Sequence, residues 1–308
     1  MKPASRPVLL ILFGFAALSP AQAQTPLPST APGWSSVREI LGPPTMEGEA
    51  FFKADYPRTD LNVVVRGVPL EPEGLGSWFL LRFDGKSTRL TGDIVLLDTE
   101  VPKAMAQALR NGLEVTALYS PFLNESPGVK RLCLQGRGAR SSLAWAAKLI
   151  LSSTGTPLGG PDSPSGPKDP AAAGLPPKNP HPPLDWSKIQ DLLGPGEMKG
   201  RTLRFEFPPL EETPQTGTAA AGAMENTTTL LFQKLEGSHL AAMGTFVLAK
   251  EDLDAVMETL IRGHITVTSL WNLGSGEEPR LFFLNFWVVG GEGEVTEALK
   301  DALDQAGL

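Results

Sequence analysis

The stretch WSSVREILGPPTMEG (residues 34–48) decides the fold, because it recurs as WSKIQDLLGPGEMKG at residues 186–200. The two stretches align without a gap at an offset of 152, and seven of their fifteen positions are identical, where chance predicts about one. The same offset continues to pair identical residues, from Gly92 with Gly244 to Pro127 with Pro279. One constant offset over almost a hundred residues predicts an internal duplication.

The length and the proline distribution place the boundaries of the two copies. The chain has 308 residues, about twice the usual length of a single domain. Residues 157–183 contain ten prolines and hardly any bulky apolar side chain, so this segment cannot bury a core. We therefore expect one repeat at 34–154, a Pro/Gly-rich linker at 155–183, and a second repeat at 184–308.

The N-terminus has the order of segments that is typical of a secretory signal peptide. Lys2 and Arg6 precede an apolar run at residues 8–18, and Ala21-Gln22-Ala23 follows. The run has 11 residues, too few for a permanent membrane span, which needs about 20. We expect cleavage after Ala23, removal of residues 1–23, and an exported protein, periplasmic or secreted, with no stable membrane span.

Hydrophobic periodicity predicts the same elements in each repeat. The first helix carries apolar residues at helical spacing and ends at Gly42-Pro43, and Gly194-Pro195 repeats this end signal. A second helix follows, capped by Asp98 or Thr99. Its apolar face is Val101, Met105, Ala108 and Leu109 in repeat 1, and Leu253, Val256, Met257, Leu260 and Ile261 in repeat 2.

Strands surround these helices. Aromatic and β-branched runs predict strands at 50–56, 61–68, 78–83, 89–96, 113–119 and 129–135, with a closing helix at 139–151. Repeat 2 gives strands at 265–271 and 280–289 and a helix at 295–305. The fold class is α+β: two homologous domains, each a largely antiparallel sheet with helices packed on it.

Composition excludes several classes of function. Lys plus Arg (27) against Asp plus Glu (34) gives a net charge of −7, which argues against a nucleic-acid partner. One Cys and three His exclude an internal disulfide and a cysteine-rich or His-rich metal site. No phosphate loop or dinucleotide-binding glycine pattern follows a predicted strand. We expect neither a metal nor a cofactor.

Nucleophilic catalysis has no sequence support, and carboxylates are the remaining candidates. There is no Gly-x-Ser-x-Gly elbow, and Cys133 lies in an alternating strand without a partner that would activate it. The candidate acidic side chains either bind a cation or a polar ligand, or serve turn chemistry and surface charge. The candidates are Asp60 beside Arg58, Asp93 after Gly92, and Glu125 and Glu277, which precede a proline in equivalent loops.

Two aromatic residues occupy equivalent positions at predicted strand ends. Tyr119 and Trp271 are related by the offset of 152. They are candidates for stacking on a sugar or another apolar ligand, and the alternative is that they fill the core.

In these segments the sequence resembles the LppY/LpqO family of exported bacterial proteins, which lacks an established activity. The resemblance covers nearly all of the chain outside the signal peptide and the linker. It rests on Tyr56-Pro57-Arg58-Thr59-Asp60-Leu61, Gly92-Asp93, Val115-Thr116-Ala117-Leu118, Leu123-x-Glu125-x-Pro127, Phe286-Trp287 and Ala302-Leu303-Asp304.

The departure from the family concerns histidines. After the Val-Thr-Ala-Leu segment the family typically has His-Asn-His, and a further His in the following strand, a set that looks like metal ligands. Here these positions hold Tyr119, Ser120, Pro121 and Cys133 in repeat 1, and Trp271, Asn272, Leu273 and Asn285 in repeat 2. The resemblance therefore implies a degenerate member that keeps the fold without the ligand set.

The sequence thus favours an exported, non-catalytic binding or interaction protein of the bacterial cell envelope, working through a cleft or face between the repeats. Its partner is an unidentified envelope ligand or protein. Two alternatives stay open: a carboxylate-based or metal-dependent hydrolase of an envelope glycan or peptide, and a self-associating surface protein.

Overall fold

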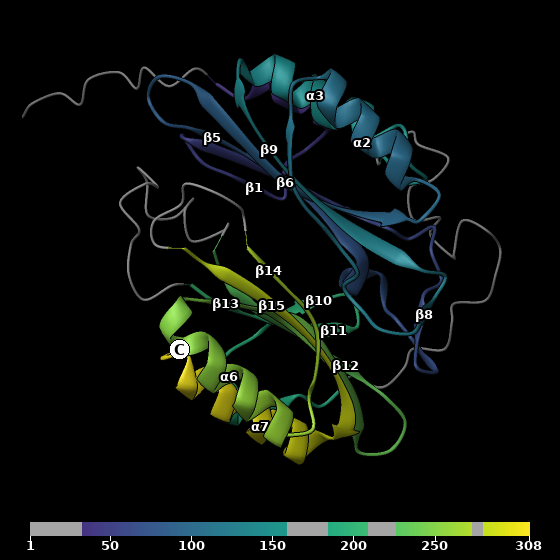
Figure 1. Cartoon of the computed structure of the whole chain (residues 1–308), viewed down its shortest axis with the longest axis vertical. Helices are drawn as coiled ribbons and strands as arrows, with labels where there is room; N and C mark the ends of the chain where they lie inside the picture. The colour runs from purple at the N-terminus through teal and green to yellow at the C-terminus, as the bar shows by residue number, and fades with distance from the viewer. Residues whose placement is uncertain (1–32, 159–183, 209–225, 273–279) are drawn as a thin grey trace, which may run out of the picture. The chain divides into compact units, whose positions relative to one another are not determined.

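The computed structural model of the chain describes residues 33–158, 184–208, 226–272 and 280–308 (Figure 1). The predicted signal peptide, most of the predicted linker and the candidate residue Glu277 lie outside these ranges. Within them, no helix is both long enough and apolar enough to cross a membrane.

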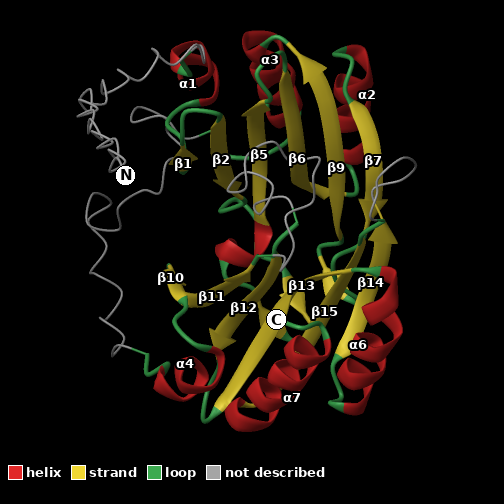
Figure 2. Cartoon of the chain, turned by 90° about the vertical axis from the view of Figure 1, so that its left-hand side faces the viewer, coloured by secondary structure: helices red, strands yellow, loops and turns green. Residues whose placement is uncertain are grey.

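Repeat 1 is a six-stranded antiparallel sheet with helices on one face (Figure 2). The strand order is β1-β2-β5-β6-β9-β7. These strands are β1 (Met46–Glu47), β2 (Phe51–Pro57), β5 (Gly76–Phe83), β6 (Thr88–Leu97), β9 (Val129–Gly138) and β7 (Glu114–Tyr119). The helices are α1 (Ser35–Leu41), α2 (Val101–Arg110) and α3 (Arg140–Leu151).

Repeat 2 has the same order, β10-β11-β12-β13-β15-β14, again antiparallel. Its strands are β10 (Glu197–Lys199), β11 (Thr202–Phe207), β12 (Thr228–Lys234), β13 (His239–Leu248), β15 (Phe282–Gly291) and β14 (Thr266–Asn272). Its helices are α4 (Ser187–Leu193), α6 (Lys250–Arg262) and α7 (Glu292–Gln305). The predicted α+β class with two homologous domains is confirmed.

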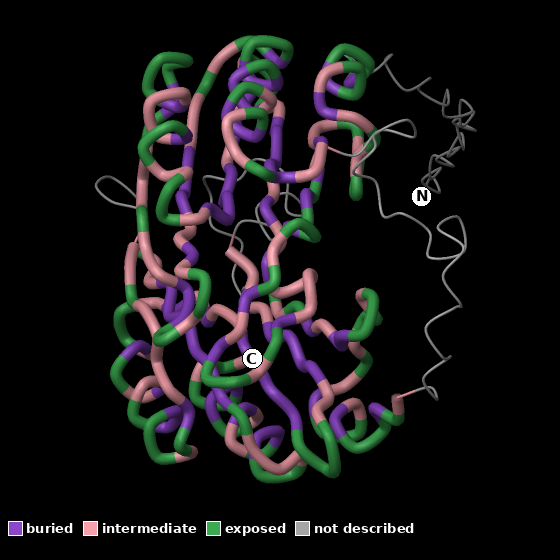
Figure 3. Tube along the Cα trace, turned by 90° about the vertical axis from the view of Figure 1, so that its right-hand side faces the viewer, coloured by how far each residue is buried: buried purple, intermediate pink, exposed green. Residues whose placement is uncertain are grey.

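Each sheet buries one face against its own helices. Along β2, Phe52, Ala54 and Tyr56 enter the helix-side core, because alternate residues of a strand share a face. Each large apolar side chain buried in this way stabilises the fold by about 1.5–3 kcal/mol. The buried segments of Figure 3 run along these strands. Helix α1 ends as predicted, since Gly42 takes a φ of 87° that favours glycine.

The predicted strand at 61–68 is wrong. Instead, β3 (Val64–Val65) and β4 (Val68–Pro69) form a short hairpin that pairs with β8 (Glu125–Ser126) in a separate three-stranded sheet. The two residues between them, Arg66 and Gly67, both have positive φ (49° and 87°), as a tight two-residue hairpin turn requires. A short 3₁₀ helix, Pro72–Leu75, follows.

Two details of the second helix also differ from prediction. The residue before α2 is Glu100, whose side chain makes no cap hydrogen bond, so neither Asp98 nor Thr99 caps the helix. Leu109 and its equivalent Ile261 are 63% and 62% exposed, because they lie beside the buried face of each helix rather than on it. The buried positions of α2 are Ala104 and Ala108.

The two repeats share a third apolar cluster, and both belong to one compact unit. Val63, Val65 and Leu75 of repeat 1 pack with Ala241 and Trp287 of repeat 2 in this shared cluster. Hydrogen bonds join the same regions. The Gln233 side chain accepts from the Glu71 backbone N–H at 3.0 Å and donates to the Pro69 carbonyl at 2.8 Å.

Candidate functional site: the cavity between the repeats

A cavity of about 530 Å³ is lined by residues of both six-stranded sheets. Its lining comes from the strand faces that point away from the helices. On β2, for example, Lys53, Asp55 and Pro57 line the cavity, while the residues between them enter the helix-side core. The cavity is therefore a product of the duplication, since neither repeat encloses it alone.

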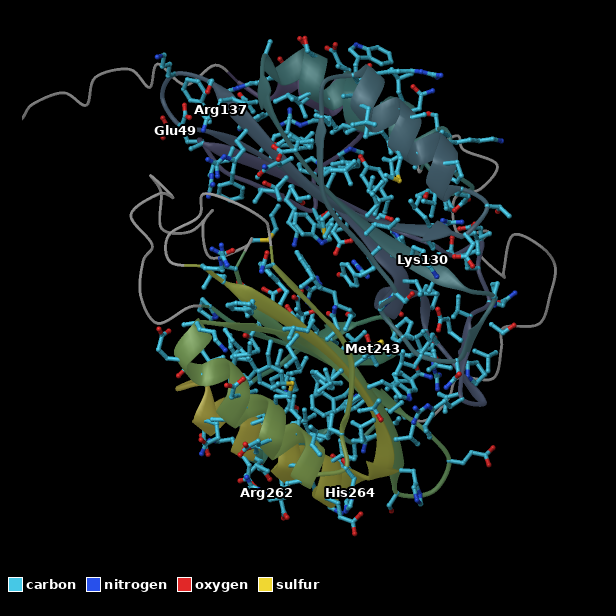
Figure 4. The ribbon with its side chains drawn as sticks, in the orientation of Figure 1. Glu49, Lys130, Arg137, Met243, Arg262 and His264 are labelled. Atoms are coloured by element: carbon cyan, nitrogen blue, oxygen red, sulfur yellow. The ribbon has the colours of Figure 1, made fainter. Side chains whose placement is uncertain are left out.

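The cavity is continuous with the shared apolar cluster. Along β6, Arg89, Thr91 and Asp93 line the cavity, and Val95, the next residue on the same face, lies in the shared cluster. Met243 belongs to both, and Figure 4 shows it on the inner side of the repeat 2 sheet. Asp93 is thus the last polar residue of this strand face before the shared cluster begins. We call the inner end of the cavity, next to this cluster, the cavity floor.

A charged group from repeat 1 forms this floor. Arg131 Nε of β9 donates to both carboxylate oxygens of Asp93, at 3.0 and 2.8 Å, and Tyr119 Oη donates to Asp93 at 3.4 Å. Burial raises the pKa of the Asp93 carboxyl, although Arg131 opposes this shift. Burial, and then the Asp93 charge, also raise the pKa of Tyr119 well above its ordinary value, so its phenol stays protonated.

Repeat 2 places neutral residues at the equivalent positions. The offset of 152 relates Asp93, Arg131, Tyr119 and Cys133 to Thr245, Phe283, Trp271 and Asn285, and all eight line the cavity. Asn285 is buried, and its side-chain amide is hydrogen-bonded through both its oxygen and its nitrogen. It accepts from Thr245 Oγ1 at 2.5 Å and donates to Ser269 Oγ at 2.7 Å. The floor is thus charged on the repeat 1 side and neutral on the repeat 2 side.

Three rings stack across the boundary between the repeats. Tyr119 stacks on Trp271 with centroids 5.0 Å apart, and Trp271 stacks on Phe283 at 4.2 Å. The predicted pair Tyr119 and Trp271 therefore lies together at the cavity, with the two rings in contact with each other.

Two equivalent β-bulges turn these aromatic residues toward the cavity. Residues four apart in a regular strand share a face, yet Val115 and Val267 pack against the helix-side cores while Tyr119 and Trp271 line the cavity. The strand register shifts directly after Val115 and directly after Val267. A bulge adds one residue and so reverses which side chains face which way.

Arg58 and Asp60 do not line the cavity but belong to a separate buried ion cluster. Arg58 is 0% exposed, and its guanidinium donates to Asp60 at 2.8 Å, to Glu100 at 2.8 Å and to the Val95 carbonyl at 2.8 Å. The Glu100 carboxylate also accepts from the backbone N–H of Leu97 and of Gly155. This cluster fixes the start of α2 to the segment after α3.

Glu125, the third predicted carboxylate within the described residues, lies neither in the cavity nor in the ion cluster. Glu125 is in β8, outside the cavity lining, and accepts a hydrogen bond from the Val129 backbone N–H at 3.3 Å. Of the three predicted carboxylates within the described residues, the structure brings Asp93 alone to the cavity.

The described residues contain no cluster of three or more His, Cys, Asp or Glu side chains that could hold a metal ion. Burial raises the pKa of the Cys133 thiol well above its ordinary value, so it is a protonated thiol in the cavity wall. His264 lies at the end of α6, on the side of repeat 2 away from the cavity (Figure 4).

Sequence reasoning missed several cavity residues. Arg131, Asn285, Trp78 and Arg89 line the cavity but were not among the predicted site residues. A signal was present in β9, where Arg131-x-Cys133-x-Gln135 alternates with leucines that enter the helix-side core. Such alternation shows that one face is polar but not that another sheet covers this face.

Comparison with known proteins places the chain in a family. A family model described as "Domain of Unknown Function (DUF1259)" matches residues 35–153 and again residues 187–305. Among curated proteins, none matches the chain. A solved structure of a double-ringed trimeric shell protein from the RMM microcompartment is 13% identical, covering 72% of this chain and 83% of its own. Its TM-score of 0.19 supports no conclusion.

The two matched segments together make up more than half of the chain and contain every strand of both six-stranded sheets. They begin and end at equivalent points of the two repeats, which supports the duplication independently of the offset. The chain therefore belongs to this family of domains of unknown function and carries the domain twice.

Proposed function

We propose that this chain is an exported, non-catalytic binding protein of the bacterial cell envelope, which holds a small ligand in the cavity between its repeats. One observation carries the proposal: a cavity of about 530 Å³ with polar and aromatic lining from two sheets. Ligand sites typically have about 300–1,000 Å³ and combine apolar walls with a few placed polar groups. Sheets are rigid supports for such groups.

Unpartnered polar atoms in cavity-lining residues support a ligand. Trp271 Nε1, Arg204 Nε and Glu73 Oε2 are buried and have no hydrogen-bond partner among the described residues, and all three residues line the cavity. An unsatisfied buried polar atom costs about 1–3 kcal/mol. A bound polar ligand or ordered water supplies the missing partners.

The geometry favours binding over acid–base catalysis. Such catalysis by carboxylates needs two groups on either side of one reacting bond. Asp60 and Glu125 are engaged outside the cavity, and within it Asp55 and Asp93 are ion-paired with Lys53 and Arg131. The Tyr119 hydroxyl and the Cys133 thiol both have raised pKa values, which makes them weak nucleophiles at neutral pH.

We further propose that the chain is a degenerate LppY/LpqO-like protein. Its binding site lies at the positions where the family has its histidines. The positions that the resemblance assigns to the family's histidines include Tyr119, Cys133, Trp271 and Asn285, and these four line the cavity. Replacement of metal-ligating side chains by neutral and aromatic ones is consistent with a change from metal binding to ligand binding.

The binding proposal is tested by equilibrium dialysis of the mature chain against a small-molecule extract of the periplasm, followed by mass spectrometry. We expect a compound that is enriched by the wild type and lost in Thr91→Trp, which fills the cavity. Leu118→Trp, on an exposed position outside the cavity, is the matched control and keeps the enrichment. Equal enrichment by both variants, or none by the wild type, contradicts the proposal.

The proposed export is tested separately by N-terminal sequencing of the protein recovered from its native host. We expect the mature chain to begin at Gln24, since Ala21-Gln22-Ala23 provides the small residues of a cleavage site. A chain that still begins at Met1 in the cytoplasmic fraction contradicts export.

A further inference from the structure

We infer that the cavity binds an acidic oligosaccharide, with the Trp78 ring as its stacking platform and Arg89 as the partner of its carboxylate. This inference rests on the proposed binding function and adds the chemical class of the ligand. Two observations carry it: one aromatic ring of the described lining stacks on no other described ring, and one cation of that lining has no ion-pair partner among the described residues.

Trp78 is the one aromatic residue of the described lining whose ring stacks on no other described ring. The five other aromatic residues each have a ring partner: Tyr119 and Phe283 stack on Trp271, Phe122 contacts Trp287, and Phe286 contacts Phe246. Lys53 Nζ lies over the Trp78 ring, 6.0 Å from its centroid. An unstacked ring in a cavity wall presents the negative face that attracts the C–H groups of a sugar.

Carboxylates flank this ring on both sides. In the strand register, Trp78 of β5 is opposite Asp55 of β2 and Asp93 of β6, and all three line the cavity. Carboxylate oxygens accept hydrogen bonds, so they suit the hydroxyl groups that project from the edge of a stacked sugar ring.

Arg89 is the unpaired cation of the described lining. The other four each have an ion-pair partner: Lys53 with Asp55, Arg131 with Asp93, Lys199 with Glu197, and Arg204 with Glu206. Arg89 has neither an ion pair nor a hydrogen bond with a described residue. A guanidinium whose donors are free matches a carboxylate in a bidentate manner.

The charged residues of the cavity lining also bear on the charge of the ligand. Its described lining carries five basic residues, the four above and Arg89, against the three acidic residues Asp55, Glu73 and Asp93, although the whole chain has a net charge of −7. Because the other four cations are ion-paired, the charge of Arg89 is the one that favours an anion over a cation as ligand.

The distance between Trp78 and Arg89 sets the minimum length of the ligand. Asp93, level with Trp78, is four residues from Arg89 along β6, a distance of about 13 Å at the usual rise of an antiparallel strand. A ligand that stacks on Trp78 and reaches Arg89 is extended, as in an oligosaccharide, rather than a single ring.

The hydroxyl content of the lining favours a saccharide over an aromatic acid. Six threonines, together with Ser77, Gln135 and Asn285, line the cavity. A hydroxyl both donates and accepts hydrogen bonds, which matches the alternating donors and acceptors of sugar hydroxyls. An aromatic carboxylate satisfies the cation and the ring but leaves these groups to water.

The test is ¹⁹F NMR of the mature chain labelled with 5-fluorotryptophan, in which Trp78→Phe assigns the Trp78 signal. The probes are digalacturonic acid, sialyllactose and a hyaluronan disaccharide, with lactose and maltose as neutral sugars and benzoate as an acid that is not a sugar. We expect at least one acidic oligosaccharide to shift the Trp78 signal in a saturable manner.

Variants then separate the two contacts. Trp78→Ala is expected to weaken the affinity for that oligosaccharide at least about tenfold, and Arg89→Gln by about 10- to 100-fold, as for loss of a charged hydrogen bond. Arg89→Gln leaves the affinity for neutral sugars unchanged. The matched controls, Trp145→Ala and Arg110→Gln, change exposed helix positions outside the cavity and keep wild-type affinity.

Three results overturn the inference. No acidic oligosaccharide of the panel shifts the Trp78 signal, or benzoate binds there as tightly as the oligosaccharides, or Arg89→Gln leaves all affinities unchanged. In each of these cases, cavity-dependent enrichment of another compound in the dialysis experiment leaves the binding function itself intact.

Discussion

At the scale of single residues, Arg58 shows how a charged side chain near a conspicuous motif serves the fold. All of its neighbouring acceptors belong to repeat 1, and its side chain is fully buried. Removing one member of a buried ion cluster leaves the others desolvated and unpaired. Loss of one member of this cluster should therefore destabilise repeat 1.

We expect Arg58→Met to lower the free energy of unfolding by about 3 kcal/mol. The physical reason is the uncompensated charge of Glu100 and Asp60, and the measurement is urea unfolding followed by circular dichroism. Arg38→Met is the matched control: Arg38 pairs with Glu47 but is 49% exposed, so its loss costs less than about 1 kcal/mol. Equal effects of the two substitutions would show that the buried cluster does not stabilise the protein.

The same cluster predicts a pH dependence. Burial alone would raise the pKa of Glu100, but hydrogen bonds from Arg58 and from the backbone N–H groups of Gly155 and Leu97 outweigh it, so the pKa lies below the ordinary value of 4.5. A lowered pKa in the folded state means that the contribution to stability is present above pH 4.5 and is lost as the pH falls further.

We therefore expect the Tm of the wild type to fall more steeply below pH 4.5 than that of Glu100→Gln, whose amide does not titrate. At neutral pH the variant has the lower Tm. Differential scanning calorimetry from pH 3 to pH 7 measures both effects, and parallel Tm curves for the two proteins contradict this assignment.

At the scale of elements, the two central strands carry glycines where side chains cannot fit. Gly92 and Gly244 are equivalent in β6 and β13. A Cβ at Gly244 would lie 2.0 Å from the Thr229 carbonyl oxygen, and one at Gly92 would lie 2.5 Å from the Phe79 ring. Glycine in a strand interior often marks such a close approach.

We expect Gly244→Ala to destabilise the protein by about 1–3 kcal/mol, because the clash is with backbone that cannot move aside. Gly293→Ala is the matched control. Gly293 lies in α7 with nothing within 4 Å of the added Cβ, so alanine there should stabilise by about 0.5–1 kcal/mol. Thermal unfolding of both variants measures the difference, and a neutral Gly244→Ala would show that the strand relaxes.

At the scale of the whole molecule, the shared apolar cluster makes the repeats dependent on each other. It buries side chains of β3, β6 and β9 from repeat 1 against β12, β13 and β15 from repeat 2. Each repeat alone would expose these apolar side chains, and an exposed apolar patch favours association.

We expect the two halves to stay together when the chain is cut at a protease site introduced at residue 168. The nicked protein should elute as one species in size-exclusion chromatography, because the cluster still holds the halves. Ala241→Asp, a buried position of the cluster, should separate them, and Ile261→Asp, an exposed position of α6, should not. Nicked wild-type halves that elute apart would contradict the role of the cluster.

The sequence by itself determined the duplication, the α+β class and the course of the elements, because these depend on local patterns: a repeated helix end at Gly42 and Gly194, and alternating strands with one apolar face. It also indicated Asp93, Tyr119 and Trp271, which line the cavity. Only the tertiary structure decided that Arg58 and Asp60 form an ion cluster, and that Arg131, Trp78 and Arg89 belong to the cavity. The physical reason is that a strand pattern reports which residues share a face, while bulges and the packing of one sheet on another decide what that face meets.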